Sequence, residues 1–179
     1  MASHRSTAWR RIALVAAVVL VLFVAASARL FVWPPTDQPV RADAVVALGG
    51  DPGQLRAQTA IALVRAGYAP EALISLGGTV EAPCPRPVPA VRIVCFRADP
   101  LDTRGEAEYV GRMAARRHWT TVIVVPGRTQ ATRARMLFER CTGARVVIVP
   151  RSGSLSQLPL AVLYEWGALT KALVLQRHC

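Results

Sequence analysis

The stretch Asp43-Ala-Val-Val-Ala-Leu-Gly-Gly50, followed by a helical pattern over 54–66 and by Ala72-Leu-Ile-Ser-Leu-Gly-Gly78, decides the fold. Parallel strands that are buried on both faces show continuous rather than alternating hydrophobicity, so the two apolar runs and the helix between them predict a parallel βαβ unit. Each run ends in a pair of glycines, which let a backbone turn sharply and approach a ligand closely. Open parallel sheets bind ligands beyond the carboxyl ends of their strands, and this edge is therefore the candidate site.

Apolar runs and helical patterns alternate through the rest of the chain. A proline-rich loop is expected over 79–91. Further strands are predicted over 92–96, 121–125 and 145–149, and helices over 103–117, 128–141 and 158–175, the last of them amphipathic. This alternation predicts an α/β fold, a three-layer α/β/α Rossmann-like sandwich with a mostly parallel sheet of about five strands.

The amino end has the features of a transmembrane helix. Residues 1–11 contain three arginines and no acid, and 12–33 is apolar but for Arg29. A helix rising 1.5 Å per residue crosses a hydrocarbon core of ~30 Å in about 20 residues. The positive-inside rule then predicts a single-pass anchor in the plasma membrane, with a cytoplasmic N-terminus, a proline-rich linker over 34–42 and an extracytoplasmic domain over 43–179. A cleaved signal peptide is the alternative, because Ala26-Ser27-Ala28 resembles a processing site.

The chain is strongly basic, with 22 basic and 11 acidic residues and a formal net charge of +11. All basic residues except Lys171 are arginine, which is compatible with ordinary surface arginine as well as with an anionic partner. A lipid bilayer is the expected partner of the amino-terminal helix, and no nucleic acid is expected, because the domain is predicted outside the cytoplasm.

Several strong sequence motifs are missing. The three histidines, His4, His118 and His178, are scattered, so neither a metal site nor a Ser-His-Asp triad is predicted. The sequence contains no G-x-x-x-x-G-K-[ST] loop and no G-x-G-x-x-G motif, the clearest nucleotide-binding patterns. No cofactor can be named from the sequence.

The four cysteines are expected to form disulfides in an oxidising exterior. Their spacing matches no C-x-x-C motif, and three pairings are possible from sequence alone. We prefer Cys84 with Cys95, because the loop between them carries three prolines and has nothing else to order it. Cys141 with Cys179 would then tie the last helix to the one before it.

Short motifs in a consistent order resemble the YdcF-like domain of unknown function. They are Asp43–Gly50, Arg56, Ser75-Leu-Gly-Gly78, Asp102-Thr-Arg-Gly-Glu-Ala107, Val124-Val-Pro-Gly127, Arg133-Ala134 and Glu165. The resemblance covers roughly residues 43–175, and the membrane-anchored members of the family include SanA- and ElyC-like envelope proteins. It implies a Rossmann-like domain with its site at the strand ends. It also implies a role in envelope integrity or in peptidoglycan and lipid-carrier metabolism, without an established reaction.

The chain departs from the family pattern at one position of chemical interest. Family members commonly carry Ser-x-x-His-x-x-Arg-Ala after the fourth strand, whereas this chain has Gly127-Arg-Thr-Gln130-Ala-Thr-Arg133-Ala134. Histidine accepts a proton near neutral pH, and glutamine does not. If the histidine transfers protons in relatives, this chain has lost that step, although Gln130 retains the ability to orient a ligand by hydrogen bonds.

The candidate site gathers residues that follow the strands or begin the next helices. Asp51 and Glu106 are the candidates for acid-base chemistry or metal ligation, and the arginines offer donor forks for a phosphate or carboxylate. The predicted ligand-binding residues are Gly49, Gly50, Arg56, Gly77, Gly78, Asp102, Thr103, Arg104, Gly127, Gln130, Arg133 and Glu165.

Each candidate also has a purely structural interpretation. Asp51 before Pro52 has the spacing of a helix cap, and Thr103 with Glu106 has the spacing of a capping box. Gly105 in a first helical turn suggests that a side chain is unwelcome there. Arg133 is compatible with a surface position, and Glu165 with routine packing.

Two functions of different classes remain. The first is an envelope enzyme acting on a phosphorylated small molecule or a lipid-linked precursor. The second is a non-catalytic module that binds such a ligand or another envelope protein at the same edge, which the change at Gln130 favours.

Overall fold

A computed structural model describes residues 3–51, 54–77, 83–151 and 158–179 of the chain. Five strands form one sheet in the order β3-β2-β1-β4-β5, and every neighbouring pair is parallel. The strands are β1 (Ala44–Ala47), β2 (Glu71–Ser75), β3 (Arg92–Phe96), β4 (Thr121–Val125) and β5 (Arg145–Ile148). The predicted α/β fold with a sheet of five strands is confirmed.

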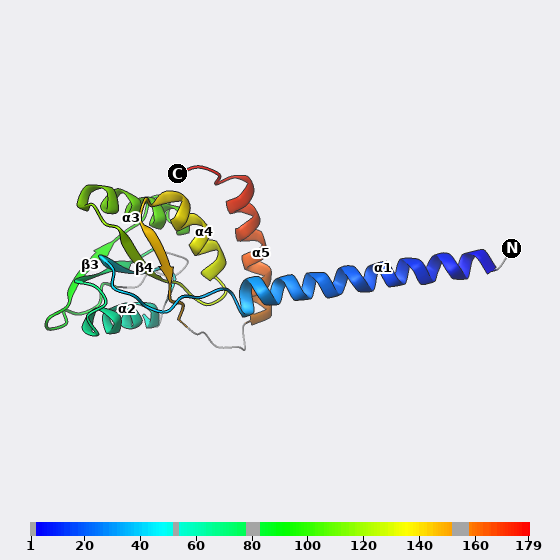
Figure 1. Cartoon of the computed structure of the whole chain (residues 1–179), viewed down its shortest axis with the longest axis horizontal. Helices are drawn as coiled ribbons and strands as arrows, with labels where there is room; N and C mark the ends of the chain where they lie inside the picture. The colour runs from blue at the N-terminus through cyan, green and yellow to red at the C-terminus, as the bar shows by residue number, and fades with distance from the viewer. Residues whose placement is uncertain (1–2, 52–53, 78–82, 152–157) are drawn as a thin grey trace.

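Helices cover both faces of the sheet (Figure 1). They are α2 (Leu55–Arg65), α3 (Thr103–Arg117), α4 (Ala131–Cys141) and α5 (Leu158–Val174). Successive side chains of a strand point to opposite faces. Val45 of β1 accordingly packs in the cluster that contains α2, whereas its neighbour Val46 packs in the cluster that contains α3 and α4. The continuous apolar runs of the sequence therefore reflect burial on both sides.

The strand predictions hold to within one residue, but two helices begin later than expected. The helix predicted over 128–141 begins at Ala131, because Gln130 N–H bonds to the Gly127 carbonyl and Ala131 N–H to the Arg128 carbonyl, which makes a turn before the helix. The helix predicted from residue 54 begins at Leu55, since Gln54 has a left-handed backbone with φ of 51°.

The helix predicted over 158–175 is present as α5, and its buried and exposed sides differ from those of an ordinary surface helix. The buried face of α5 carries Glu165 beside Leu169 and Ala172, while Leu160 and Leu163 are exposed. A buried carboxylate among exposed leucines reverses the usual arrangement of a surface helix.

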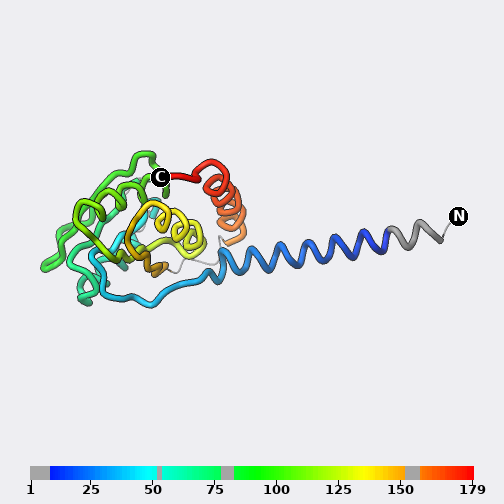
Figure 2. Tube along the Cα trace, turned by 45° about the horizontal axis from the view of Figure 1, so that its top comes forward, coloured from blue at the N-terminus to red at the C-terminus, as the bar shows by residue number. Residues whose placement is uncertain are grey.

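The amino-terminal segment forms one long helix that projects from the domain (Figures 1 and 2). α1 (Ser3–Ser27) continues into a π-helix, η1 (Ala28–Val32). The part from Trp9 to Val32 is long and apolar enough to cross a membrane, and most of it is exposed. This agrees with the predicted transmembrane helix in length and composition.

The predicted linker over 34–42 lies against the domain. Asp37 N–H donates to the Ile148 carbonyl at 2.9 Å, and Ile148 N–H donates to the Asp37 carboxylate at 2.8 Å. These bonds occupy backbone groups of β5, which is an edge strand of the sheet. Covering an edge in this way protects it from pairing with other chains.

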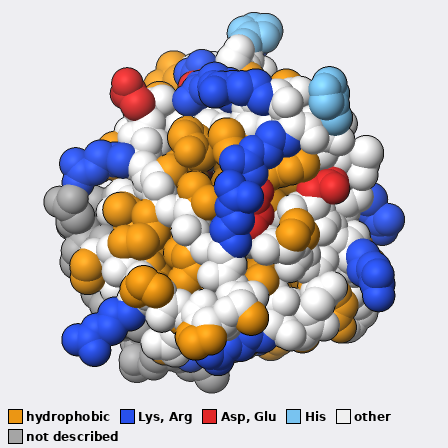
Figure 3. All heavy atoms as spheres, turned by 90° about the vertical axis from the view of Figure 1, so that its left-hand side faces the viewer, with side chains coloured by type: hydrophobic (Ala, Val, Ile, Leu, Met, Phe, Trp, Pro, Cys, Tyr) orange, Lys and Arg blue, Asp and Glu red, His pale blue; other side chains and the backbone are white. Residues whose placement is uncertain are grey.

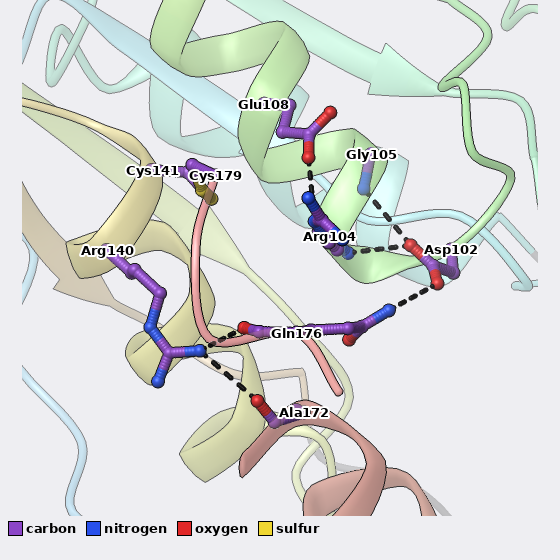
Figure 4. The surroundings of a disulfide bond; sticks show 9 residues. All are labelled: Asp102, Arg104, Gly105, Glu108, Arg140, Cys141, Ala172, Gln176 and Cys179. Carbon is purple, nitrogen blue, oxygen red and sulfur yellow. Dashed lines mark hydrogen bonds and ion pairs between the residues drawn. A yellow bond between two sulfur atoms is a disulfide. The ribbon is translucent and has the colours of Figure 1, made fainter. Parts of the chain in front are cut away.

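Two disulfides join the cysteines as preferred from the sequence, Cys84 with Cys95 and Cys141 with Cys179, and their Cα atoms are 6.0 and 5.3 Å apart. Figure 4 shows how the second bridge holds the C-terminal segment beside α4. In the same region Arg140 donates to the carbonyl groups of Ala172 and Gln176. The C-terminus is therefore fixed against the domain.

Basic side chains are spread among apolar and uncharged ones on the face of the domain opposite α1 (Figure 3). On this face they do not gather into a single positive patch of the kind typical of nucleic-acid binding. The distribution agrees with the interpretation of most arginines as ordinary surface residues.

Candidate functional site

The carboxyl ends of the central strands open into a cavity of about 490 Å³. β1 lies between β2 and β4, and the helix after β1 (α2) and the helix before β4 (α3) cover opposite faces of the sheet. Open α/β sheets bind ligands beside the strands where the connections change face in this way. Four helices contribute charged side chains to the cavity lining: Arg56 from α2, Glu106 from α3, Arg133 from α4 and Glu165 from α5. The cavity is open and is not filled by packed side chains.

Arg56 holds the loop that follows β1. Its Nη1 donates to the Gly49 carbonyl at 2.7 Å, and its Nη2 donates to the Gly50 carbonyl at 2.8 Å. Gly50 has φ of 72°, a left-handed conformation that glycine adopts without strain. Burial lowers the pKa of Arg56, while Asp51 and Glu106 partly offset the effect. The guanidinium is thus buried at the strand edge and fixed by backbone oxygens.

Asp51 lies beside the start of α2. Its carboxylate accepts a hydrogen bond from Arg56 N–H at 2.5 Å, and Oδ2 lies 3.9 Å from Arg56 Nε. The expected N-cap position of Asp51 is wrong, because Gln54 occupies it and α2 begins at Leu55, but the Asp51 carboxylate still accepts from an N–H group of the first turn. Asp51 is not among the residues that line the large cavity.

Arg133 and Glu165 form a buried, two-pronged ion pair between α4 and α5. Arg133 Nε and Nη2 each donate to one Glu165 oxygen at 2.9 Å, and both side chains are at least nine-tenths buried. Burial alone would lower the pKa of Arg133, but the bonds from Glu165 raise it above its ordinary value. The alternative of a surface position for Arg133 is therefore wrong, whereas Glu165 is packed inside the domain with an arginine as its partner.

The cap at the start of α3 is one residue earlier than the predicted capping box places it. Asp102 is the cap, and its carboxylate accepts from Arg104 N–H at 3.0 Å and from Gly105 N–H at 3.1 Å. Thr103 is left free of a capping role, and its hydroxyl accepts from Arg133 Nη1 at 2.8 Å. Glu106 likewise turns toward the cavity, so both residues belong to the site.

Asp102 also ties α3 to the C-terminal segment. Its carboxylate accepts from Lys171 Nζ at 3.1 Å and from Gln176 Nε2 at 2.9 Å. Figure 4 shows the bond from Gln176. Burial raises the pKa of Asp102, but the bonds from Gly105, Lys171 and Gln176 outweigh it and lower the pKa below its usual value.

Glu106 is the one buried carboxyl of the lining that has no direct hydrogen bond from an arginine among the described residues. Its Oε1 accepts from Gly49 N–H at 2.7 Å. Burial raises the pKa of Glu106, and Gly49 N–H, Arg56 and Arg133 offset only part of this effect. A carboxyl group that holds its proton more tightly than usual, facing a cavity, has the property required of a general acid.

Ser75, the last residue of β2, contributes its side-chain hydroxyl to the lining of the same cavity. Ser75 is only 5% exposed and lines the cavity. Its Oγ makes no hydrogen bond of regular geometry to a residue that the structure describes, but it lies near enough to the Glu106 carboxyl to lower the pKa of that group. Buried polar groups are normally hydrogen-bonded, so this hydroxyl is available to a ligand or to water.

Gln130 connects the two arginine clusters. Its Oε1 accepts from Arg56 Nη1 at 3.1 Å, and its Nε2 donates to the Thr103 hydroxyl at 2.9 Å. A single glutamine thereby links α2 to α3 across the cavity. The position where relatives are expected to carry histidine is thus an organising position in this chain.

The structure brings most of the predicted ligand-binding residues together. The cavity lining includes Gly49, Gly50, Arg56, Gly77, Asp102, Thr103, Gly127, Gln130, Arg133 and Glu165. Arg104 does not line it and instead pairs with Glu108 on the same helix at 2.7 Å. Gly78 lies outside the described residues. The prediction that Gly105 tolerates no side chain has a packing explanation, because a Cβ at this position would overlap the Pro100 carbonyl oxygen.

Ser75 and Tyr164 line the cavity but were not predicted. The position of Ser75 immediately before Leu76 and Gly77, at the end of a buried strand, is the pattern that identifies it. Tyr164 has no comparable pattern, since it depends on how α5 packs.

Within the described ranges, no group of three or more His, Cys, Asp or Glu side chains is arranged to hold a metal ion. The charged groups that line the cavity are two guanidiniums and three carboxyls, which form an ion pair and a set of backbone hydrogen bonds. Such a set is suited to binding a polar ligand through hydrogen bonds and charge.

We expect the variant Glu106→Gln to become increasingly more stable than the wild type as the pH rises. Because the folded-state pKa of Glu106 is raised, the unfolded chain releases this proton first. The folded state is therefore disfavoured progressively from the unfolded pKa of about 4.3 up to the higher folded pKa. Glutamine keeps an acceptor for Gly49 N–H and does not titrate. Urea unfolding of both proteins from about pH 4 to about pH 8 measures the difference, and a difference independent of pH would contradict the expectation.

Comparisons of the chain with protein-family models, with curated proteins and with solved structures found no match. Its function is accordingly argued from the geometry and chemistry of the cavity.

Proposed function

We propose that the chain is a membrane-anchored cell-envelope protein of the YdcF-like family that binds an anionic, phosphorylated or lipid-carrier-linked ligand at the carboxyl edge of its sheet. The role expected for it lies in envelope integrity or peptidoglycan-related metabolism. The observation that carries the proposal is the convergence of two buried guanidinium groups, Arg56 and Arg133, on an open cavity at the strand ends.

The charge state of the cavity supports an anionic ligand. Arg56 is bonded to carbonyl and amide oxygens, and its nearest carboxylate, that of Asp51, lies 3.9 Å from Nε. Burial raises the pKa of Glu106, so this carboxyl holds its proton more tightly than an exposed one and compensates Arg56 less. The positive charge of Arg56 is therefore only partly compensated, which favours a phosphate or carboxylate beside it.

The amino-terminal helix supports the proposed location. The segment Trp9–Val32 suffices to cross a bilayer, and Arg10 and Arg11 lie at its amino end. We propose that this end lies on the cytoplasmic side of the plasma membrane, because clusters of arginine are retained there. The domain then lies outside the cytoplasm.

A melting-temperature screen of the full chain in detergent tests ligand binding. The probes are inorganic phosphate, glucose 1-phosphate, ADP and farnesyl phosphate, each compared with its unphosphorylated parent where one exists. We expect at least one phosphorylated probe to raise Tm where its parent does not. A screen in which no phosphorylated probe exceeds its parent or buffer would contradict the anionic ligand.

Ser75→Ala is the sharpest variant for that screen, because the Ser75 hydroxyl makes no hydrogen bond of regular geometry to the described residues and loses only its approach to the Glu106 carboxyl. We expect it to leave Tm nearly unchanged without ligand and to weaken binding about tenfold, the effect of one hydrogen bond to a charged group. Thr59→Ala is the matched control, since this hydroxyl bonds to the Leu55 carbonyl of its own helix, outside the cavity.

A non-catalytic binding module is the second candidate, and Gln130 is the observation that favours it. Glutamine transfers no proton, and here it is already engaged by Arg56 and Thr103. If Gln130→His creates turnover of the probe that binds, a degenerate enzyme is supported. Binding without turnover in either form supports the module.

A further inference from the structure

The solvent face of α5 carries an apolar stripe at helical spacing. Leu160, Leu163 and Tyr164 are 64 to 74% exposed, and Gly167 and Val174 continue the same face. The only charged residues between Leu158 and Val174 are Glu165, which is buried, and Lys171. The exposed surface of α5 is therefore mainly apolar, with Thr170 and Lys171 as exposed polar side chains, and it carries no negative charge.

α5 packs directly against the end of the long amino-terminal helix. Trp166 stacks on Phe23 with ring centroids 5.4 Å apart and meets Phe31 edge-on at 5.3 Å. Its indole N–H donates to the Ser27 hydroxyl at 3.0 Å. Phe31 is completely buried, and α5 therefore has a fixed position relative to the last turns of α1 and η1.

The depth of these contacts can be compared with the thickness of a bilayer. Counted from Ile12, just after the last arginine, a hydrocarbon core of ~30 Å extends about 20 residues, to the region of Phe31. Phe23 lies eight residues before Phe31, which is about 12 Å along a helix. Trp166 touches both, so α5 meets α1 at a level that belongs to the outer leaflet.

The orientation of α5 is also suited to that level. Figures 1 and 2 show α5 crossing the end of α1 on the side of the domain from which α1 projects. Glu165, Leu169 and Ala172 are buried against the domain, whereas Leu160 and Val174 are exposed. Leu163, Tyr164 and Gly167, although exposed, border a groove that Arg133 also lines. With α1 upright in a bilayer, a helix placed in this way lies along the membrane surface.

We propose that α5 is an interfacial helix whose apolar stripe is immersed in the outer leaflet of the membrane that α1 spans. The proposal rests on the proposed membrane anchoring of the chain, and its occupant is lipid. Interfacial helices bury an apolar face at the boundary between headgroups and acyl chains, with basic residues beside it. The apolar side chains of α1 from Ile12 to Val24 are exposed as well, so the same lipid would meet both helices.

This placement explains the reversed pattern of α5. A face of leucines opposite a buried Glu165 is unfavourable in water but is expected when the solvent on that side is lipid. Tyr164 belongs to the stripe and also lines the cavity, so the mouth of the site would lie at the bilayer surface.

Photocrosslinking of the full chain in phospholipid nanodiscs tests the proposal. p-Benzoylphenylalanine replaces Leu163 on α5, Val19 on α1 or Ala115 on α3, all exposed positions. Ala115 lies in the last turn of α3, at the opposite end from the cavity. We expect lipid adducts at Leu163 and Val19 at least about tenfold above those at Ala115, because only the first two contact acyl chains.

The three positions separate the ways in which the proposal can fail. Lipid adducts at Val19 without adducts at Leu163 would overturn the interfacial helix and leave the anchor intact. Adducts of Leu163 to a second copy of the chain would assign the stripe to a dimer and equally overturn it. Absence of lipid adducts at Val19 would overturn the membrane anchor itself. None of these three outcomes bears on ligand binding in the cavity.

Discussion

We expect Arg133→Met to lower the free energy of unfolding by about 3 to 5 kcal/mol, because it leaves the Glu165 carboxylate buried without its partner. The pair is two-pronged at 2.9 Å, and the side chains are only 9% and 5% exposed. The same change removes a donor from the Thr103 hydroxyl. Urea unfolding of the full chain in detergent at neutral pH measures the loss.

Two further variants isolate the buried charge as the cause. Arg135→Met, two residues away on the same helix, removes more exposed pairs with Asp37 and Glu139 and should cost less than about 1 kcal/mol. Combining Arg133→Met with Glu165→Gln should recover part of the stability, since no unpaired charge is then buried. An Arg133→Met variant as stable as Arg135→Met would mean that Glu165 is not isolated by burial.

The fold was predictable because its determinants are local in sequence. The runs at 44–48, 72–76 and 121–125 are apolar without alternation, and only a parallel sheet covered on both faces buries such runs completely. Helix starts were less predictable, since several capping residues compete. At the start of α3 both Asp102 and Thr103 have the right chemistry, and the backbone selects Asp102.

The site was predictable to the extent that parallel topology alone determines it. Glycines after β1, β2 and β4 must meet at one edge, and Arg56 and Arg133 enter it from the first two turns of their helices. Pairings across the cavity were not predictable. The bond from Gly49 N–H to Glu106 joins residues 57 apart in sequence, and it depends on how α3 packs on the sheet.

α5 marks the clearest limit of reasoning from hydrophobic pattern. Such reasoning predicts an amphipathic helix over 158–175 and assumes that its apolar face is covered by protein. In the structure the core side carries Glu165, because Arg133 of α4 supplies its partner. A pattern cannot reveal which face has an ionic partner on another helix.

Gly49→Ala should destabilise the fold by about 3 kcal/mol or more, at or above the upper end of the range for overpacking. A Cβ at Gly49 would overlap the Gly77 carbonyl oxygen and lie 3.0 Å from the Ser75 hydroxyl. The oxygen belongs to the backbone that follows β2, so it yields only if the two strand ends separate. That movement would also disturb the bond from Gly49 N–H to Glu106 and the one from Arg56 to the Gly49 carbonyl.

Gly127→Ala is the matched control, at the end of a third strand of the same edge. A Cβ there meets no atom within 4 Å, so we expect a change in unfolding free energy below about 1 kcal/mol. Urea unfolding of the two variants beside the wild type gives the comparison. Equal stability of the two variants would show that the ends of β1 and β2 have room to separate. In that case the close approach of these two glycine-ended strands would not determine the shape of the cavity.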